Sequence, residues 1–147
     1  MKKILVAIDF SDVSARVLHM AGDLARTQGA ELHLVHVMEP EPTYSAYGFT
    51  GDDLPAMREY HEEARKRARR ALDKRVADVG GGVVVRERLL DGRPVDEILE
   101  HATQEKIDLI IVGSHGHGAI ASLFLGSVAE SLVRRAKFPV LVVPAAS

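Results

Sequence analysis

The sequence predicts an α/β fold built on a single doubly wound, five-stranded parallel sheet with helices on both faces. Short apolar runs alternate along the chain with amphipathic stretches of helical period, in the order β-α-β-α-β-α-β-α-β. Several apolar runs are continuous, as in strands that are covered on both faces. A length of 147 residues with 46% hydrophobic side chains fits one domain, residues 1–147, whose core needs no covalent staple.

The first predicted strand is the apolar run 4–8, which Asp9 follows. Ser11 is expected to cap the next helix, because a side-chain oxygen there can accept a hydrogen bond from a free backbone N–H group. Gly29 is expected to end that helix, since glycine readily takes the left-handed conformation of a C-cap. A second strand rich in Leu and Val covers residues 32–37.

Residues 39–55 are rich in Pro, Gly and Tyr and predict a long loop, a feature that is usually functional or disordered. A long helix follows over residues 57–79 and stops at three consecutive glycines, Gly80 to Gly82. The third strand is predicted over residues 83–90. The predicted inner side of the long helix comprises Tyr60, Ala64, Ala68, Ala71, Leu72, Val76 and Val79.

Pro94 opens the next helix, where it is favoured in the first turn. The fourth strand is predicted over residues 109–112, and a glycine-rich loop over 113–126 follows it. A short helix over residues 127–137 and a last strand over 140–143 complete the expected chain.

Composition excludes several classes of function. Lys plus Arg number 19 against 21 for Asp plus Glu, so the net charge of −2 argues against nucleic-acid binding driven by bulk positive charge. Aromatic residues make up only 5%, which disfavours a base-stacking surface. The absence of cysteine excludes disulfides, thiolate metal sites and a cysteine nucleophile.

The apolar run at the N-terminus is too short for a signal peptide. No apolar stretch reaches the length of about 18 residues that a membrane helix needs. A cytoplasmic protein with no membrane partner is therefore expected.

The glycine-rich loop is the strongest candidate site. Gly113, Gly116 and Gly118 follow a buried strand, and Gly126 with Ser127 opens a helix eight residues later. Glycines let backbone N–H groups approach an anion, and a helix N-terminus adds free donors and a positive dipole. The Gly-Lys-Ser/Thr of a P-loop is absent, and a formal match to the dinucleotide pattern lacks its acidic residue.

The spacing G-x2-G-x9-G-S from Gly113 to Ser127 resembles the ATP-binding pattern of the universal stress protein family. The surrounding VGSHGHGAIASLFLGSVAESLVRRAKFPVLVVP resembles that family nearly throughout, as do ILVAIDFSDVSARVL, LHLVHV and DGRPVDEIL. The resemblance implies a fold like that of the adenine nucleotide alpha hydrolases, with strand order 3-2-1-4-5.

The resemblance also implies the site. Asp9 and Val37 correspond to positions that contact the adenosine part of a nucleotide, and Ala7 precedes them where many relatives carry Pro. The implied ligand is ATP, with AMP or ADP as alternatives and a Mg or Mn ion held mainly by phosphates. The candidates around the ribose and phosphates are Val112, Gly113, His115, Gly116, His117, Gly126, Ser127 and Val128.

Structural explanations compete with these roles. Residues 127–130 read Ser-Val-Ala-Glu, a capping box in which the Ser127 hydroxyl would satisfy its own helix. Gly113 and Gly116 could be turn glycines, and Asp9 could simply end the first strand. The basic cluster over residues 65–75 is interleaved with acidic residues, which favours a solvated helix face over a nucleic-acid surface.

Three functions follow from these patterns. The first is a nucleotide-binding stress-response module that recruits partner proteins not identifiable from the sequence. It would act as a homodimer through the last strand, Val140, Leu141, Val142 and Val143, as the resemblance implies. The second is a slow ATPase, although no catalytic residue is predicted. The third is a nucleotide-free dimeric adaptor.

Overall fold

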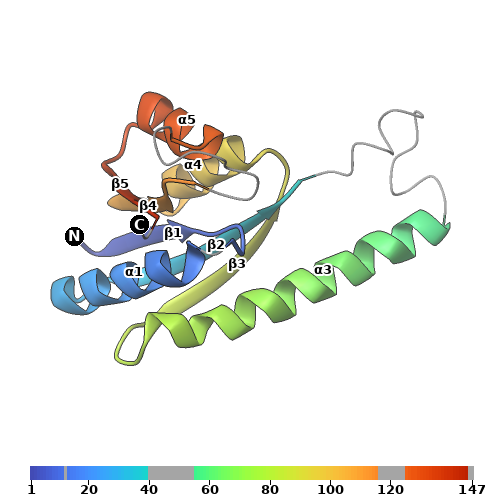
Figure 1. Ribbon diagram of the computed structural model, residues 1–147, viewed down its shortest axis with the longest axis horizontal. Helices are drawn as coiled ribbons and strands as arrows, with labels where there is room; N and C mark the ends of the chain where they lie inside the picture. The colour runs from blue at the N-terminus through green and yellow to red at the C-terminus, as the bar shows by residue number, and fades with distance from the viewer. Residues whose placement is uncertain (12, 40–54, 116–124, 146–147) are drawn as a thin grey trace.

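The computed structural model describes residues 1–11, 13–39, 55–115 and 125–145. Within these residues, strands and helices alternate along the chain (Figure 1). The elements are β1 (Lys3–Ala7), α1 (Ser14–Gln28), β2 (Glu31–Met38), α3 (Pro55–Arg75), the 3-10 helix η1 (Val76–Val79), β3 (Val85–Asp91), α4 (Pro94–Gln104), β4 (Leu109–Gly113), α5 (Ser127–Arg135) and β5 (Val140–Val143).

The five strands form one parallel sheet in the order β3-β2-β1-β4-β5, which confirms the predicted fold and strand order. β1 is central and pairs with β2 on one side and β4 on the other, with Ala7 opposite both Val35 and Val112. The chain therefore builds outward from β1 to β3 and then crosses back to β4. Strand order reverses between β1 and β4, so a crevice is expected beyond their carboxyl ends.

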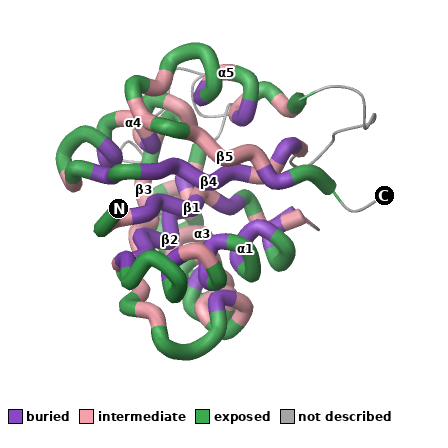
Figure 2. Tube along the Cα trace, turned by 90° about the vertical axis from the view of Figure 1, so that its left-hand side faces the viewer, coloured by how far each residue is buried: buried purple, intermediate pink, exposed green. Residues whose placement is uncertain are grey.

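Helices cover both faces of the sheet, and each face has its own apolar core. α1, α3 and η1 lie against one face, and α4 and α5 lie against the other (Figure 1). Along β1 the side chains alternate between the two cores, so that Ile4 and Val6 pack toward α1 while Leu5 packs toward α4 and α5. The buried stretches concentrate in the strands (Figure 2), as expected for a sheet covered on both faces.

The first helix begins later than expected. α1 starts at Ser14 with Val13 as its N-cap residue and has no side-chain cap hydrogen bond, so the prediction that Ser11 caps this helix is wrong. The backbone N–H of Ser11 instead donates to Asp9 Oδ1 at 3.0 Å, which makes Ser11 part of a turn. Gly29 ends α1 in the left-handed conformation with φ 63°, as predicted.

The long helix differs from its prediction at both ends. α3 begins at Pro55 and gives way to the 3-10 helix η1 after Arg75. Leu72 and Val79 are buried as expected, but Tyr60 is 51% exposed, so its assignment to the inner side is wrong. Tyr60 belongs to the N-terminal half of α3, and this half runs beyond the sheet (Figure 1).

The remaining boundaries shift by a few residues. β3 covers Val85–Asp91 where residues 83–90 were expected, and α5 ends at Arg135 before the expected Lys137. β5 has the predicted bounds. Such shifts are ordinary, because the ends of elements depend on tertiary contacts more than on local pattern.

Gly22 lies in the middle of α1, where glycine is usually unfavourable. A Cβ atom there would lie 2.1 Å from the carbonyl oxygen of Val79, because η1 crosses α1 at this point. The same carbonyl accepts a hydrogen bond from the Arg26 guanidinium at 2.9 Å. Close packing of backbone against backbone therefore explains this glycine.

We expect Gly22→Ala to lower the free energy of unfolding by about 2 kcal/mol or more, because the overpacking penalty exceeds the roughly 1 kcal/mol by which Ala favours a helix interior. Urea unfolding followed by circular dichroism measures the change. Gly81→Ala is the matched control, since a Cβ there meets nothing within 4 Å. Equal stabilities for the two variants would contradict the assigned packing.

A chain of polar side chains crosses the face of the sheet that α4 covers. His33 Nε2 donates to Glu31 Oε1 at 2.8 Å, and this carboxylate also receives Arg86 Nε at 2.7 Å. His33 Nδ1 lies 3.1 Å from His101 Nε2, so the two imidazoles share a hydrogen bond. Burial, and secondly the neighbouring His33, lower the pKa of His101 below the ordinary value of 6.5.

This lowered pKa predicts a pH dependence of stability. Below about pH 6.5 the unfolded chain binds a proton at His101 that the folded chain resists, so the free energy of unfolding falls as the pH is lowered from there. We expect His101→Gln, whose amide can still donate to His33, to show a weaker fall between about pH 7 and pH 5 than the wild type. Denaturant titrations at several pH values test this, and identical slopes would contradict it.

Candidate functional site

A cleft of about 870 Å³ opens at the carboxyl edge of the sheet, where strand order reverses. Its walls come from the ends of β1, β2 and β4, the N-termini of α1 and α5, and one side of α3. Gly116 and His117, which were also predicted, lie outside the described residues. The predicted site residues that line the cleft are Ala7, Asp9, Val37, Val112, Gly113, His115, Gly126, Ser127 and Val128.

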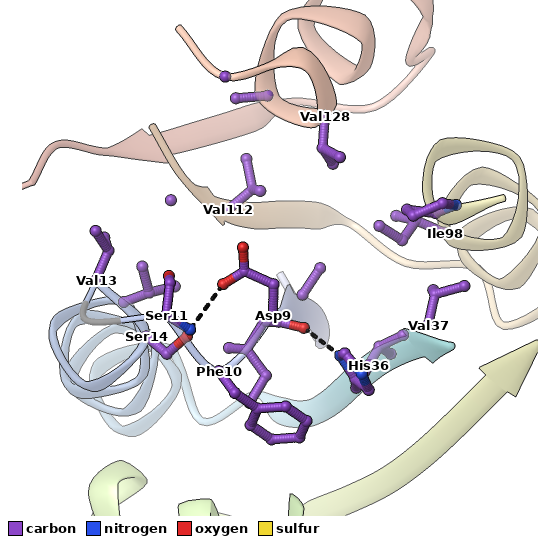
Figure 3. A pocket seen from close by; sticks show the side chains of 18 of the residues that line it. Asp9, Phe10, Ser11, Val13, Ser14, His36, Val37, Ile98, Val112 and Val128 are labelled. Atoms are coloured by element: carbon purple, nitrogen blue, oxygen red, sulfur yellow. Dashed lines mark hydrogen bonds between the residues drawn. The ribbon is translucent and has the colours of Figure 1, made fainter. Parts of the chain in front are cut away.

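Asp9 lies in the turn that leaves β1 and lines the centre of the cleft (Figure 3). Its Oδ1 accepts the backbone N–H of Ser11, which is the hydrogen bond of an Asx turn. Phe10 between them has φ 63°, a left-handed conformation that costs an aromatic residue of order 1–3 kcal/mol. The turn therefore fixes the direction of the Asp9 carboxylate, which points toward Val112 in Figure 3.

His36 on β2 holds the same turn from the other side. Its Nδ1 donates to the carbonyl oxygen of Ile8 at 2.8 Å, and its ring lies 4.4 Å from the ring of Phe10. Figure 3 shows both rings on the side of the turn away from Val112. In the sequence, the alternation of side chains along a strand predicts only that His36 and His33, three residues apart, point to opposite faces of the sheet.

Apolar side chains form the surface beside the carboxylate. Val37 and Val112 are buried at the ends of β2 and β4, and Ile98 of α4 lies behind them. Val128 of α5 packs partly against the same core (Figure 3). An apolar surface beside a carboxylate of fixed direction can bind a flat heterocycle and orient it.

Gly113 is the last residue of β4 and lies beside the start of α1. A Cβ atom there would lie 3.1 Å from Val13 Cγ1 and 3.3 Å from Val17 Cγ2. Packing against α1 therefore explains this glycine, and it is a residue of β4, not of a turn.

Ser114 joins three segments at the cleft. Its N–H donates to the Val143 carbonyl at 2.8 Å, and its own carbonyl accepts the N–H of Gly126 at 2.6 Å. Its hydroxyl accepts the N–H of Ala145 at 3.2 Å and lies 2.8 Å from His115 Nδ1. These contacts hold the end of β4, the end of β5 and the start of α5 together. Ser114 belongs to the loop predicted over residues 113–126, but its sequence context predicted no role for it.

The start of α5 differs from the capping box that the sequence predicted. Gly126 is the N-cap residue, Ser127 is the first helical residue, and no side-chain cap hydrogen bond forms, so the capping-box assignment of Ser127 is wrong. Ser127 is exposed at the cleft. The first hydrogen bond of the helix runs from Glu130 N–H to the Gly126 carbonyl. The N–H groups of residues 127–129 have no intrahelical acceptor, which makes this end of the cleft suited to an anion.

α3 contributes a wall that the site prediction did not include. Arg67, Ala68 and Ala71 line the cleft, and Arg67 is the one Lys or Arg among its described lining residues. The small alanines lie on the helix face that the sequence predicted to point inward. Their place at the cleft depends on how α3 crosses the sheet, and the local sequence pattern of the helix does not predict this crossing.

Neither of two other structural signals appears in the described part of the chain. No group of three or more His, Asp or Glu side chains there is arranged to hold a metal ion. No helix there is both long and apolar enough to cross a membrane.

Comparisons with known proteins agree on one family. The sequence profile described as "Universal stress protein family" matches residues 1–144. A universal stress protein of Thermus aquaticus is 40% identical over 144 residues, which cover 97% of this chain and 98% of the relative.

Solved structures of the same kind superpose over nearly the whole chain. A universal stress protein from Archaeoglobus fulgidus in complex with dAMP matches with a TM-score of 0.70 and 27% identity, covering 97% of each chain. A universal stress protein in complex with cAMP matches with a TM-score of 0.65 and 31% identity, covering 97% of this chain and 95% of the other. The chain therefore belongs to the universal stress protein family.

Proposed function

We propose that this protein binds an adenine nucleotide, ATP foremost, in the cleft at the carboxyl edge of the sheet and acts as a nucleotide-dependent regulatory module. The observation that carries the proposal is the meeting of Asp9, the apolar ends of β2 and β4, and the N-terminus of α5 in that one cleft. The dAMP and cAMP complexes of similar proteins support the choice of an adenine nucleotide.

The two ends of the cleft suit the two ends of a nucleotide. The adenosine part would lie against Val37 and Val112, with Asp9 accepting hydrogen bonds from its polar groups. The phosphates would lie at the N-terminus of α5, where the N–H groups of residues 127–129 and the Ser127 hydroxyl are the donors. A cleft volume of about 870 Å³ lies within the usual range for small-molecule sites.

A Mg or Mn ion would be held mainly by the phosphates, because the described residues offer no metal site of their own. We favour a regulatory function over catalysis for two reasons. The sequence carries no P-loop lysine, and the donors at the α5 end of the cleft are backbone N–H groups. Phosphate release from ATP measures the alternative of slow hydrolysis. Failure of the wild type to bind any adenine nucleotide would leave the nucleotide-free adaptor as the surviving function.

We expect Asp9→Asn to weaken binding of ATP and adenosine by about tenfold or more, because a hydrogen bond to a charged group contributes roughly 1.5–3 kcal/mol. The asparagine oxygen can still accept the Ser11 N–H, so the turn survives and the melting temperature changes little. Isothermal titration calorimetry measures the affinities.

Glu59→Gln is the matched control for this variant, since it removes the same charge from an exposed position on α3. Wild-type affinity in Asp9→Asn would contradict the assignment of Asp9 to the ligand. Equal losses in both variants would indicate a net-charge effect.

We also propose that the protein forms a homodimer through β5. This strand is the edge of the sheet next to β4, and its first three residues, Val140, Leu141 and Val142, are only partly buried. An uncovered apolar edge readily pairs with another strand. The Pro139 carbonyl accepts from Ile110 of β4 and the Val143 carbonyl accepts from Ser114 just after β4, so alternation turns the backbone groups of Val140 and Val142 outward.

We expect the wild type to be dimeric at micromolar concentration and Val142→Pro to be monomeric, because proline removes an outward N–H donor without breaking the ladder to β4. Size-exclusion chromatography with light scattering measures the mass, and far-UV circular dichroism checks that the variant is folded. A monomeric wild type, or a folded Val142→Pro dimer, would contradict pairing through β5.

A further inference from the structure

The Ser114 hydroxyl lies in a nearly closed environment next to the cleft. Ser114 is only 5% exposed. Its Oγ accepts the Ala145 N–H at 3.2 Å and lies 2.8 Å from Nδ1 of His115. These are the two partners of the hydroxyl within the described part of the chain. A hydroxyl has one hydrogen to donate and two lone pairs that accept, so its few partners decide where that hydrogen goes.

The hydrogen bond between Ser114 Oγ and His115 Nδ1 can form with either group as the donor, and the burial of Ser114 favours one of these two directions. If His115 Nδ1 carried the hydrogen and donated it to Oγ, the Ser114 hydroxyl would accept twice, and its own hydrogen would have no acceptor among the residues that the structure describes. A buried donor without an acceptor costs about 1–3 kcal/mol. If the hydroxyl donates to Nδ1, each of these polar groups is satisfied. The neutral His115 ring must then carry its hydrogen on Nε2.

We propose that Ser114 is a positioning residue that holds His115 as an Nε2–H donor for a phosphate oxygen of the bound nucleotide. This inference rests on the proposed nucleotide site and adds a directed side-chain donor to it. His115 lines the same cleft as Gly126 and Ser127. The Ser114 carbonyl also accepts the Gly126 N–H at 2.6 Å, so one residue holds both the imidazole and the N-terminus of α5.

The arrangement also links the site to the end of the sheet. Ser114 Oγ also accepts the N–H of Ala145, which is the second residue after β5, and the Ser114 N–H donates to the carbonyl of Val143, the last residue of β5. The orientation of His115 therefore depends on the end of β5 remaining in place.

The tautomer can be measured directly in the nucleotide-free protein. Long-range proton–nitrogen NMR spectra at mildly alkaline pH distinguish Nδ1–H from Nε2–H imidazoles, and His115→Gln assigns the signal. We expect the Nε2–H form of His115 in the wild type, a shift toward a tautomer mixture in Ser114→Ala, and recovery in Ser114→Thr, which retains the hydroxyl. An Nδ1–H wild type, or an unchanged spectrum in Ser114→Ala, would overturn the proposal.

The second readout is ATP affinity by calorimetry. We expect Ser114→Ala and His115→Gln each to weaken binding about three- to tenfold, which is the range for one hydrogen bond. The double variant should be no weaker than the poorer single variant, because both changes remove one contact. Additive losses would show that Ser114 acts independently of His115 and would overturn the proposal.

The two readouts separate this inference from the proposed function. If the wild type binds no adenine nucleotide, the proposed function and the phosphate contact both fail, whereas the tautomer measurement still decides whether Ser114 holds His115. If ATP binds but the tautomer is wrong, only the positioning role of Ser114 fails.

Discussion

The parallel pairing of β1 with β4 is the contact on which the rest of the structure depends. It places Ala7 beside Val112 and brings the carboxyl ends of two strands together, although about a hundred residues separate them. Because the chain leaves β1 toward β2 and leaves β4 toward β5, the two connections diverge and open the cleft. The loops that carry Asp9 and Ser114 begin at this point, so their separation is fixed by the hydrogen bonds of the sheet.

The chemistry of the cleft comes mainly from the backbone. The chain has no cysteine and a net charge of −2, so an anion site cannot rely on thiolates or on the overall field of the protein. What the structure supplies is local: the N–H groups at the start of α5, a carboxylate fixed by its own turn, and a glycine that lets α1 pack against β4. Ser114 connects these parts, since its hydrogen bonds reach β5, α5 and His115.

The sequence predicted the fold well because apolar runs and helical periods are local signals, and the strand order followed from the resemblance to a known family. It also selected residues that line one cleft. The failures fall where tertiary contacts override local pattern. Ser11 was expected to cap α1, but it lies in the turn that Asp9 forms, and the helix begins only at Ser14 with Val13 as its N-cap residue. The Ser-Val-Ala-Glu pattern predicted a capping box, but Gly126 precedes the helix as its cap. The pairing of His36 with Phe10 and the crossing of α3 over the cleft join distant segments, so no local pattern could reveal them.

The central claim is that a nucleotide lies across the cleft with its phosphates at the N-terminus of α5. Backbone amide NMR titrations with ATP and with adenosine test it most directly, because the two ligands share a base and a sugar but differ in the phosphates. Both ligands should shift the amides of Val37 and Val112, and only ATP should strongly shift those of residues 126–129. Shifts from ATP that leave residues 126–129 unchanged, or that fall outside the residues lining the cleft, would contradict this account.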